Sequence, residues 1–284
     1  MMNKPFLSEL YYKAFQSGNK LYLVIAINTL IFLVLGILSL IDVLAKTPLS
    51  SFLISQLSLP ANLGDLLYRP WTIITYMFTQ LAFFHFLFNM LWLYWIGLIF
   101  LAFLNNRQFL FTYFAGGIFG GLLFLALFNL IPSFYSRQAI LIGSSGAVYA
   151  IIVAAATLVP NYTLRLLFFG NVQLKYLVVA FIILNILGLN GANIGGNLAH
   201  LGGALFGFIY IHQLRKGNDW SKLFTRNKPK LRVIRNEQAP KNNHSFTNQE
   251  YIDSILDKIS RSGYNSLSKA EKDALFNASK QDKG

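Results

Sequence analysis

Two side chains that could act together in catalysis, the hydroxyl of Ser145 and the imidazole of His200, lie at the edges of long apolar stretches. A serine becomes a nucleophile when a neighbouring base takes its proton, and histidine is the base used most often. No Asp or Glu occurs between Asp65 and Asp219. The residues therefore predict a serine–histidine dyad without an acidic third member.

Other chemistries of membrane-embedded enzymes and carriers lack the residues that they need in this chain. Zinc proteases need a cluster such as His-Glu-x-x-His, and aspartyl proteases need two aspartates, but the apolar segments contain no Glu and a single Asp, Asp42, near the end of the first segment. A proton-coupled transporter usually carries such carboxylates as well. A Ser–Lys dyad would need a lysine at the depth of the serine, whereas Lys175 is expected at the opposite membrane face. We therefore expect a catalyst without metal or cofactor.

The residues around Ser145 suit a nucleophile at the start of a helix. Gly143 precedes the Ser144–Ser145 pair and Gly146 follows it. Free backbone amides and the helix dipole at such a terminus would stabilise an anionic tetrahedral intermediate. The alternative is a helix-packing serine that hydrogen-bonds to its own backbone.

The segment that follows His200 is suited to close packing between helices. Gly203 and Gly207 form a small-xxx-small face, and Gly146 belongs to a similarly small face in the segment of Ser145. Close approach is what a serine–histidine hydrogen bond between two helices requires. Tyr149, one helical turn after the serine, is expected either beside the imidazole or in ordinary core packing.

Two further polar residues, His85 and Asn89, are four positions apart and therefore share one helix face. Both can donate hydrogen bonds, which suits an oxyanion site. The alternative is a structural role, in which they bridge helices or line a wet cavity.

The composition indicates a membrane protein, since 55% of the 284 residues are hydrophobic and only 12% are charged. About 20 apolar residues span a bilayer as a helix. We predict an all-α, polytopic membrane protein with a six-helix bundle. The six predicted helices cover residues 21–44, 84–104, 109–131, 146–159, 174–189 and 198–214.

Most of the 24 Lys and Arg residues lie before residue 21 or from Arg215 onward. This asymmetry places the N- and C-termini in the cytoplasm. We expect a multi-pass protein of a bacterial cytoplasmic (inner) membrane. Spans two, four and six would then run inward, which places His85, Asn89, Ser145 and His200 at a similar depth near the outer face.

Four regions follow from these patterns. Residues 1–20 form a cytosolic N-terminal segment, 21–214 a six-span membrane domain, 215–245 a basic linker, and 246–284 a small cytosolic helical hairpin. The net charge of +13 is expected to attract anionic lipid, and no nucleic-acid partner is expected.

Taken in order, these elements resemble the rhomboid family of intramembrane serine proteases from about Arg69 to Arg215. The matching motifs are Pro70-Trp71, His85-x-x-x-Asn89, Gly143-x-Ser145-Gly146 with Tyr149, and Ala199-His200-x-x-Gly203-x-x-x-Gly207. The chain departs from the family pattern at Gln80, where a histidine is common.

The resemblance implies that Ser145 is the nucleophile and His200 the general base of an intramembrane serine endopeptidase. It implies an oxyanion hole of His85, Asn89 and the Ser145 amide, with Tyr149 stacked on the imidazole. Substrates would be single-span membrane proteins, cut near the outer membrane face. They would enter past span five, under a loop at Asn190–Asn197. The alternative is a catalytically silent rhomboid-like binder of membrane proteins, and the sequence does not indicate an oligomeric state.

Overall fold

The structure is a computed structural model that describes residues 6–134, 138–166, 170–191, 193–224 and 246–281. The chain divides into two compact units, residues 1–226 and 227–284.

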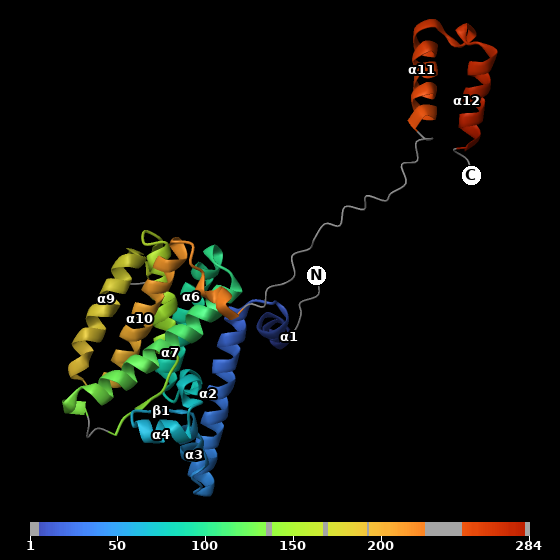
Figure 1. Cartoon of the computed structure of the whole chain (residues 1–284). Helices are drawn as coiled ribbons and strands as arrows, with labels where there is room; N and C mark the ends of the chain where they lie inside the picture. Colours follow the sequence, from blue (N-terminus) through green and yellow to red (C-terminus); the bar gives the residue numbers. More distant parts are fainter. Residues whose placement is uncertain (1–5, 135–137, 167–169, 192, 225–245, 282–284) are drawn as a thin grey trace. The chain divides into compact units, whose positions relative to one another are not determined.

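The first unit is a bundle of apolar helices (Figure 1). Among the described residues, four helices are long and apolar enough to cross a membrane, and two apolar helices are shorter. The longer helices are α2 (Lys20–Ala45), α6 (Phe83–Phe103), α7 (Asn106–Leu130) and α10 (Ile194–Arg215). The shorter ones are α8 (Ser145–Leu158) and α9 (Leu174–Leu187). The predicted all-α polytopic bundle is confirmed.

Two helices, α7 and α10, begin several residues before their predicted starts, because asparagine caps extend them toward their N-terminal ends. Asn105 accepts hydrogen bonds from the backbone amides of Arg107 and Gln108, which starts α7 at Asn106 rather than at Phe109. The side chain of Asn193 accepts one from the Gly196 amide, which starts α10 at Ile194 rather than at Leu198.

The early start of α10 corrects the predicted loop Asn190–Asn197, because Ile194–Asn197 is helical. A segment rich in glycine and asparagine reads as a loop from composition, but the Asn193 cap holds it in the first turn of the helix.

Helix α8 lies at the centre of the bundle, packed against α10, α7 and α6. Nearly all of its side chains are buried. Buried helices of this kind are apolar on every face, and α8 is short and rich in alanine, which lets its neighbours approach closely.

The connection between α2 and α6 contains three short α-helices, one strand and a 3₁₀ turn at Tyr76–Phe78, and its strand pairs with the segment just before α8. The helices are α3 (Leu49–Leu57), α4 (Leu63–Tyr68) and α5 (Thr72–Thr75). Strand β1 (Leu59–Pro60) pairs antiparallel with β2 (Ile140–Leu141), with Leu59 opposite Leu141. This pairing fixes the chain just before Gly143.

A second, separate pair of antiparallel strands links α8 to α9. Strands β3 (Thr163–Leu166) and β4 (Gly170–Gln173) form this hairpin, which the sequence analysis did not predict.

Part of the segment predicted as a basic linker is folded against the helices. Asp219 accepts hydrogen bonds from Arg107 at the start of α7 and from Tyr210 of α10. It also accepts one from Ser221, in the short helix Trp220–Phe224. Residues 225–245 of the predicted linker lie outside the described residues.

The second unit contains α11 (Phe246–Ser262) and α12 (Lys269–Gln281). A capping box starts α12: the Ser268 amide donates to the Glu271 carboxylate at 2.7 Å, and the Glu271 amide donates to Ser268 Oγ at 3.3 Å. Lys258 of α11 donates to the same carboxylate at 2.8 Å. Hydrogen bonds from Lys258 and Ser268 lower the pKa of the Glu271 carboxyl to about 2.

Candidate active site

The hydroxyl of Ser145 and the imidazole of His200 are in hydrogen-bond contact, although 55 residues separate them in the chain. Ser145 Oγ lies 2.6 Å from His200 Nε2. Ser145 is the first residue of α8 and is buried, and His200 lies in the second turn of α10. The neighbouring Ser144 is fully buried just before α8. The hydroxyl that contacts the imidazole is therefore that of Ser145.

The turn that presents Ser145 depends on Gly143. Its φ of +108° is a backbone conformation that residues with a side chain rarely adopt. Its amide donates to the Tyr76 carbonyl at 2.8 Å, which ties the turn to the α2–α6 connection. A Cβ atom at Gly143 would lie 2.9 Å from Cε1 of His85, so the ring of His85 packs directly against this turn.

Helix packing at two glycines of α10 brings the two dyad residues together. A Cβ atom at Gly203 would overlap the carbonyl oxygen of Gly146, and one at Gly207 would overlap that of Ala150. The backbones of α8 and α10 thus touch without intervening side chains, as small-xxx-small faces allow. The predicted approach of these two faces is confirmed.

Asn89 is buried and belongs to a chain of polar side chains inside the bundle. Its Nδ2 donates to Gln80 Oε1 at 2.9 Å, and Gln80 Nε2 donates to Asn28 Oδ1 at 2.9 Å. Asn28 Nδ2 then donates to the Tyr113 hydroxyl at 3.2 Å. Buried amides need such partners. An amide nitrogen carries two hydrogens, so Asn89 can still donate one hydrogen bond.

The imidazole of His200 is held on its face and at its second nitrogen. The Tyr149 ring stacks on it, with ring centroids 4.4 Å apart and an interplanar angle of 3°. Asn185 of α9 lies with Oδ1 2.6 Å from His200 Nδ1. Asn185 was not among the predicted site residues, although an isolated amide inside an apolar segment is itself a signal of function.

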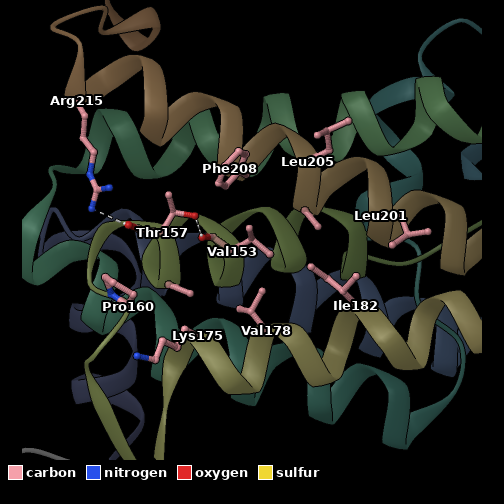
Figure 2. Close-up of a pocket in the computed structure, with 12 residues that line it drawn as sticks. Val153, Thr157, Pro160, Lys175, Val178, Ile182, Leu201, Leu205, Phe208 and Arg215 are labelled. Atoms are coloured by element: carbon pink, nitrogen blue, oxygen red, sulfur yellow. Dashed lines mark hydrogen bonds between the residues drawn. The ribbon is translucent and has the colours of Figure 1, made fainter.

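A cavity of about 530 Å³ lies between α8, α9 and α10 and does not include the dyad. Figure 2 shows Val178 and Ile182 of α9 on one side of it and Leu205 of α10 on another. Lys175 and Arg215 lie at the end away from Leu201, where Arg215 donates to the carbonyl oxygen of Thr157 at 2.7 Å. Along this cavity α9 is separated from α10.

The fold and the apolar helices define a multi-pass integral membrane protein, whose environment is a lipid bilayer. A family model described as the rhomboid domain matches residues 68–217, more than half of the chain. The chain therefore belongs to the rhomboid family, which points to intramembrane serine proteases. A second model, described as a family of unknown function (DUF6576), matches residues 242–281. No curated protein matches the chain.

Proposed function

We propose that this protein is an intramembrane serine endopeptidase in which Ser145 is the nucleophile and His200 the general base. The observation that carries the proposal is the 2.6 Å contact between Ser145 Oγ and His200 Nε2. A nucleophile within hydrogen-bond reach of its base is the arrangement that covalent catalysis requires.

The reaction follows from this geometry. Ser145 Oγ attacks the carbonyl carbon of the scissile peptide bond while its proton passes to His200 Nε2. The tetrahedral intermediate collapses when His200 returns that proton to the leaving amine, which leaves an acyl group on Ser145. Water then attacks the acyl group, with the same Nε2 as base, and restores the free serine.

Three donors are available to stabilise the negative charge that develops on the carbonyl oxygen of the substrate. The amide of Ser145 lies at the N-terminus of α8, where the helix dipole favours an anion. His85 lies against the Gly143 turn, and Asn89 retains one amide hydrogen. In this proposal His85, Asn89 and the Ser145 amide form the oxyanion hole.

The short length of α8 supports a cleavage site below the membrane surface. Its 14 residues extend about 21 Å, less than the roughly 30 Å of hydrocarbon in a bilayer. A substrate whose peptide bond reaches Ser145 would therefore be a membrane-spanning segment. We place both termini in the cytoplasm of a bacterial cell, so single-span membrane proteins are cut near the outer face.

The test is cleavage of a single-span reporter protein in liposomes by wild type, Ser144→Ala, Ser145→Ala and His200→Ala. Cleavage by the wild type and by Ser144→Ala, and its loss in the other two variants, is expected. Cleavage that persists in folded Ser145→Ala would refute the assignment. Folded wild type that binds the reporter without cutting it would be a silent binder.

A further inference from the structure

The base of the proposed dyad must hold its proton on one particular ring nitrogen. Nε2 of His200 can accept the Ser145 proton only while this nitrogen is unprotonated. The neutral ring must therefore carry its hydrogen on Nδ1. The two tautomers of a histidine are selected by the hydrogen bond that the other nitrogen makes. The group that faces Nδ1 therefore decides whether the ring is a base toward Ser145.

The group facing Nδ1 is the amide of Asn185, whose orientation is set by its own neighbours. Asn185 Nδ2 donates to the backbone carbonyl of Phe181 at 2.7 Å and to the Tyr149 hydroxyl at 2.8 Å. A backbone carbonyl can only accept hydrogen bonds, so the nitrogen of the amide must face Phe181. The oxygen then faces His200 at 2.6 Å, where it accepts the hydrogen on Nδ1.

We propose that Asn185 is the positioning residue of this site, which holds His200 in the tautomer that makes Nε2 a base. This inference rests on the proposed function. It gives the dyad a neutral third member, in the stretch between Asp65 and Asp219 that contains no Asp or Glu. Asn185 does not touch the reacting serine, so it acts only through the imidazole and through Tyr149.

The setting of Asn185 in α9 supports this role over ordinary packing. Asn185 is buried, whereas Ile183, Leu184, Ile186 and Leu187 around it are all more than half exposed. Nearer the start of α9, the cavity of Figure 2 separates this helix from α10. A buried amide in an apolar helix costs free energy unless it is hydrogen-bonded, and all the partners of Asn185 other than Phe181 belong to the candidate site.

The experiment compares wild type, Asn185→Leu and Asn185→Asp in two readouts, reporter cleavage in liposomes and ¹⁵N NMR of labelled histidine side chains. Asn185→Leu is nearly isosteric and lacks the acceptor, whereas Asn185→Asp keeps an acceptor for Nδ1–H. The matched control is Asn171→Leu, the same change at an exposed position in β4, away from the candidate site. The His200 signals are identified by their loss in His200→Gln.

In wild type we expect the His200 signals of a ring protonated at Nδ1 and bare at Nε2. In Asn185→Leu we expect a mixture of tautomers, and kcat lower by about 10²-fold, the lower end of what a positioned base contributes. KM should change little, since no substrate contact is removed. Asn185→Asp should keep the wild-type tautomer and cleave faster than Asn185→Leu, and Asn171→Leu should match wild type in both readouts.

A wild-type ring protonated at Nε2 would overturn the inference, as would Asn185→Leu with an unchanged tautomer, whatever its rate. A lower rate with an unchanged tautomer would mean that Asn185 only anchors α9 against the neighbouring helices. If Asn185→Leu does not fold, the spectra of wild type and Asn185→Asp still show which ring nitrogen of His200 carries the hydrogen, and this decides whether the inference holds. The tautomer is measured without substrate, so failure of the proposed function would appear separately, as cleavage that survives Ser145→Ala.

Discussion

Replacement of Gly203 by alanine tests whether close contact between α8 and α10 holds the dyad together. The added methyl group would overlap the carbonyl oxygen of Gly146 and lie 2.8 Å from its carbonyl carbon. Both atoms are backbone and cannot rotate away. Restoring ordinary contact would part the helices by about 1 Å, and a misplacement of that size costs roughly 10²-fold in rate.

The variant should also lose about 1–3 kcal/mol of stability, the usual cost of overpacking a core. Gly36→Ala is the matched control, because a Cβ atom there meets nothing within 4 Å. In a helix such as α2 this control should be neutral, or more stable by about 0.5–1 kcal/mol. Both variants are compared by reporter cleavage in liposomes and by denaturant unfolding in micelles. Wild-type cleavage and stability in Gly203→Ala would refute the reasoning.

Three further predictions address other parts of the molecule. Asn28→Leu leaves the side-chain amide of Gln80 without its acceptor, so the free energy of unfolding in micelles should fall by about 1–3 kcal/mol. An unchanged free energy of unfolding would show that this chain of buried hydrogen bonds does not stabilise the fold. Tyr149→Phe keeps the stacked ring but removes one hydrogen bond, so cleavage should slow only about fivefold, the equivalent of about 1 kcal/mol, and loss of all activity would contradict this. The pKa of Glu271 falls from 4.5 to about 2 on folding, so its contribution to the α11–α12 unit is complete above pH 4.5 and disappears as the pH falls toward 2. In hydrogen exchange of the full-length protein, the protection of α12 should fall between pH 4.5 and 2 in wild type but not in Glu271→Gln. Equal pH dependence of the two proteins would show that Glu271 does not cause the loss of protection.

Much of the bundle follows from length and apolar composition, because a bilayer admits few alternatives to helices. The start of α10 could not be predicted in the same way. Its first turn is built from glycine and asparagine, and it depends on one side-chain cap, from Asn193. Caps of this kind are local contacts that segment composition does not reveal.

The candidate site could be predicted as far as the residues that stand out against apolar sequence. Ser145 and His200 have motifs and flanking glycines, and the structure places them in contact; their catalytic roles remain a prediction. Asn185 has no motif. Because α9 is apolar on almost every face, periodicity does not show which of its residues face α8 and α10. Only the packing of three helices brings its amide to the imidazole.

The measurement that tests the central claim most directly is the position of a fluorophosphonate adduct on the wild-type protein in a lipid bilayer, mapped by mass spectrometry. The reagent bonds to a serine oxygen that a neighbouring base has activated. The account predicts one adduct, on Ser145, which His200→Ala abolishes and Ser144→Ala leaves in place. An adduct on Ser144, or labelling of Ser145 that persists in His200→Ala, would contradict it.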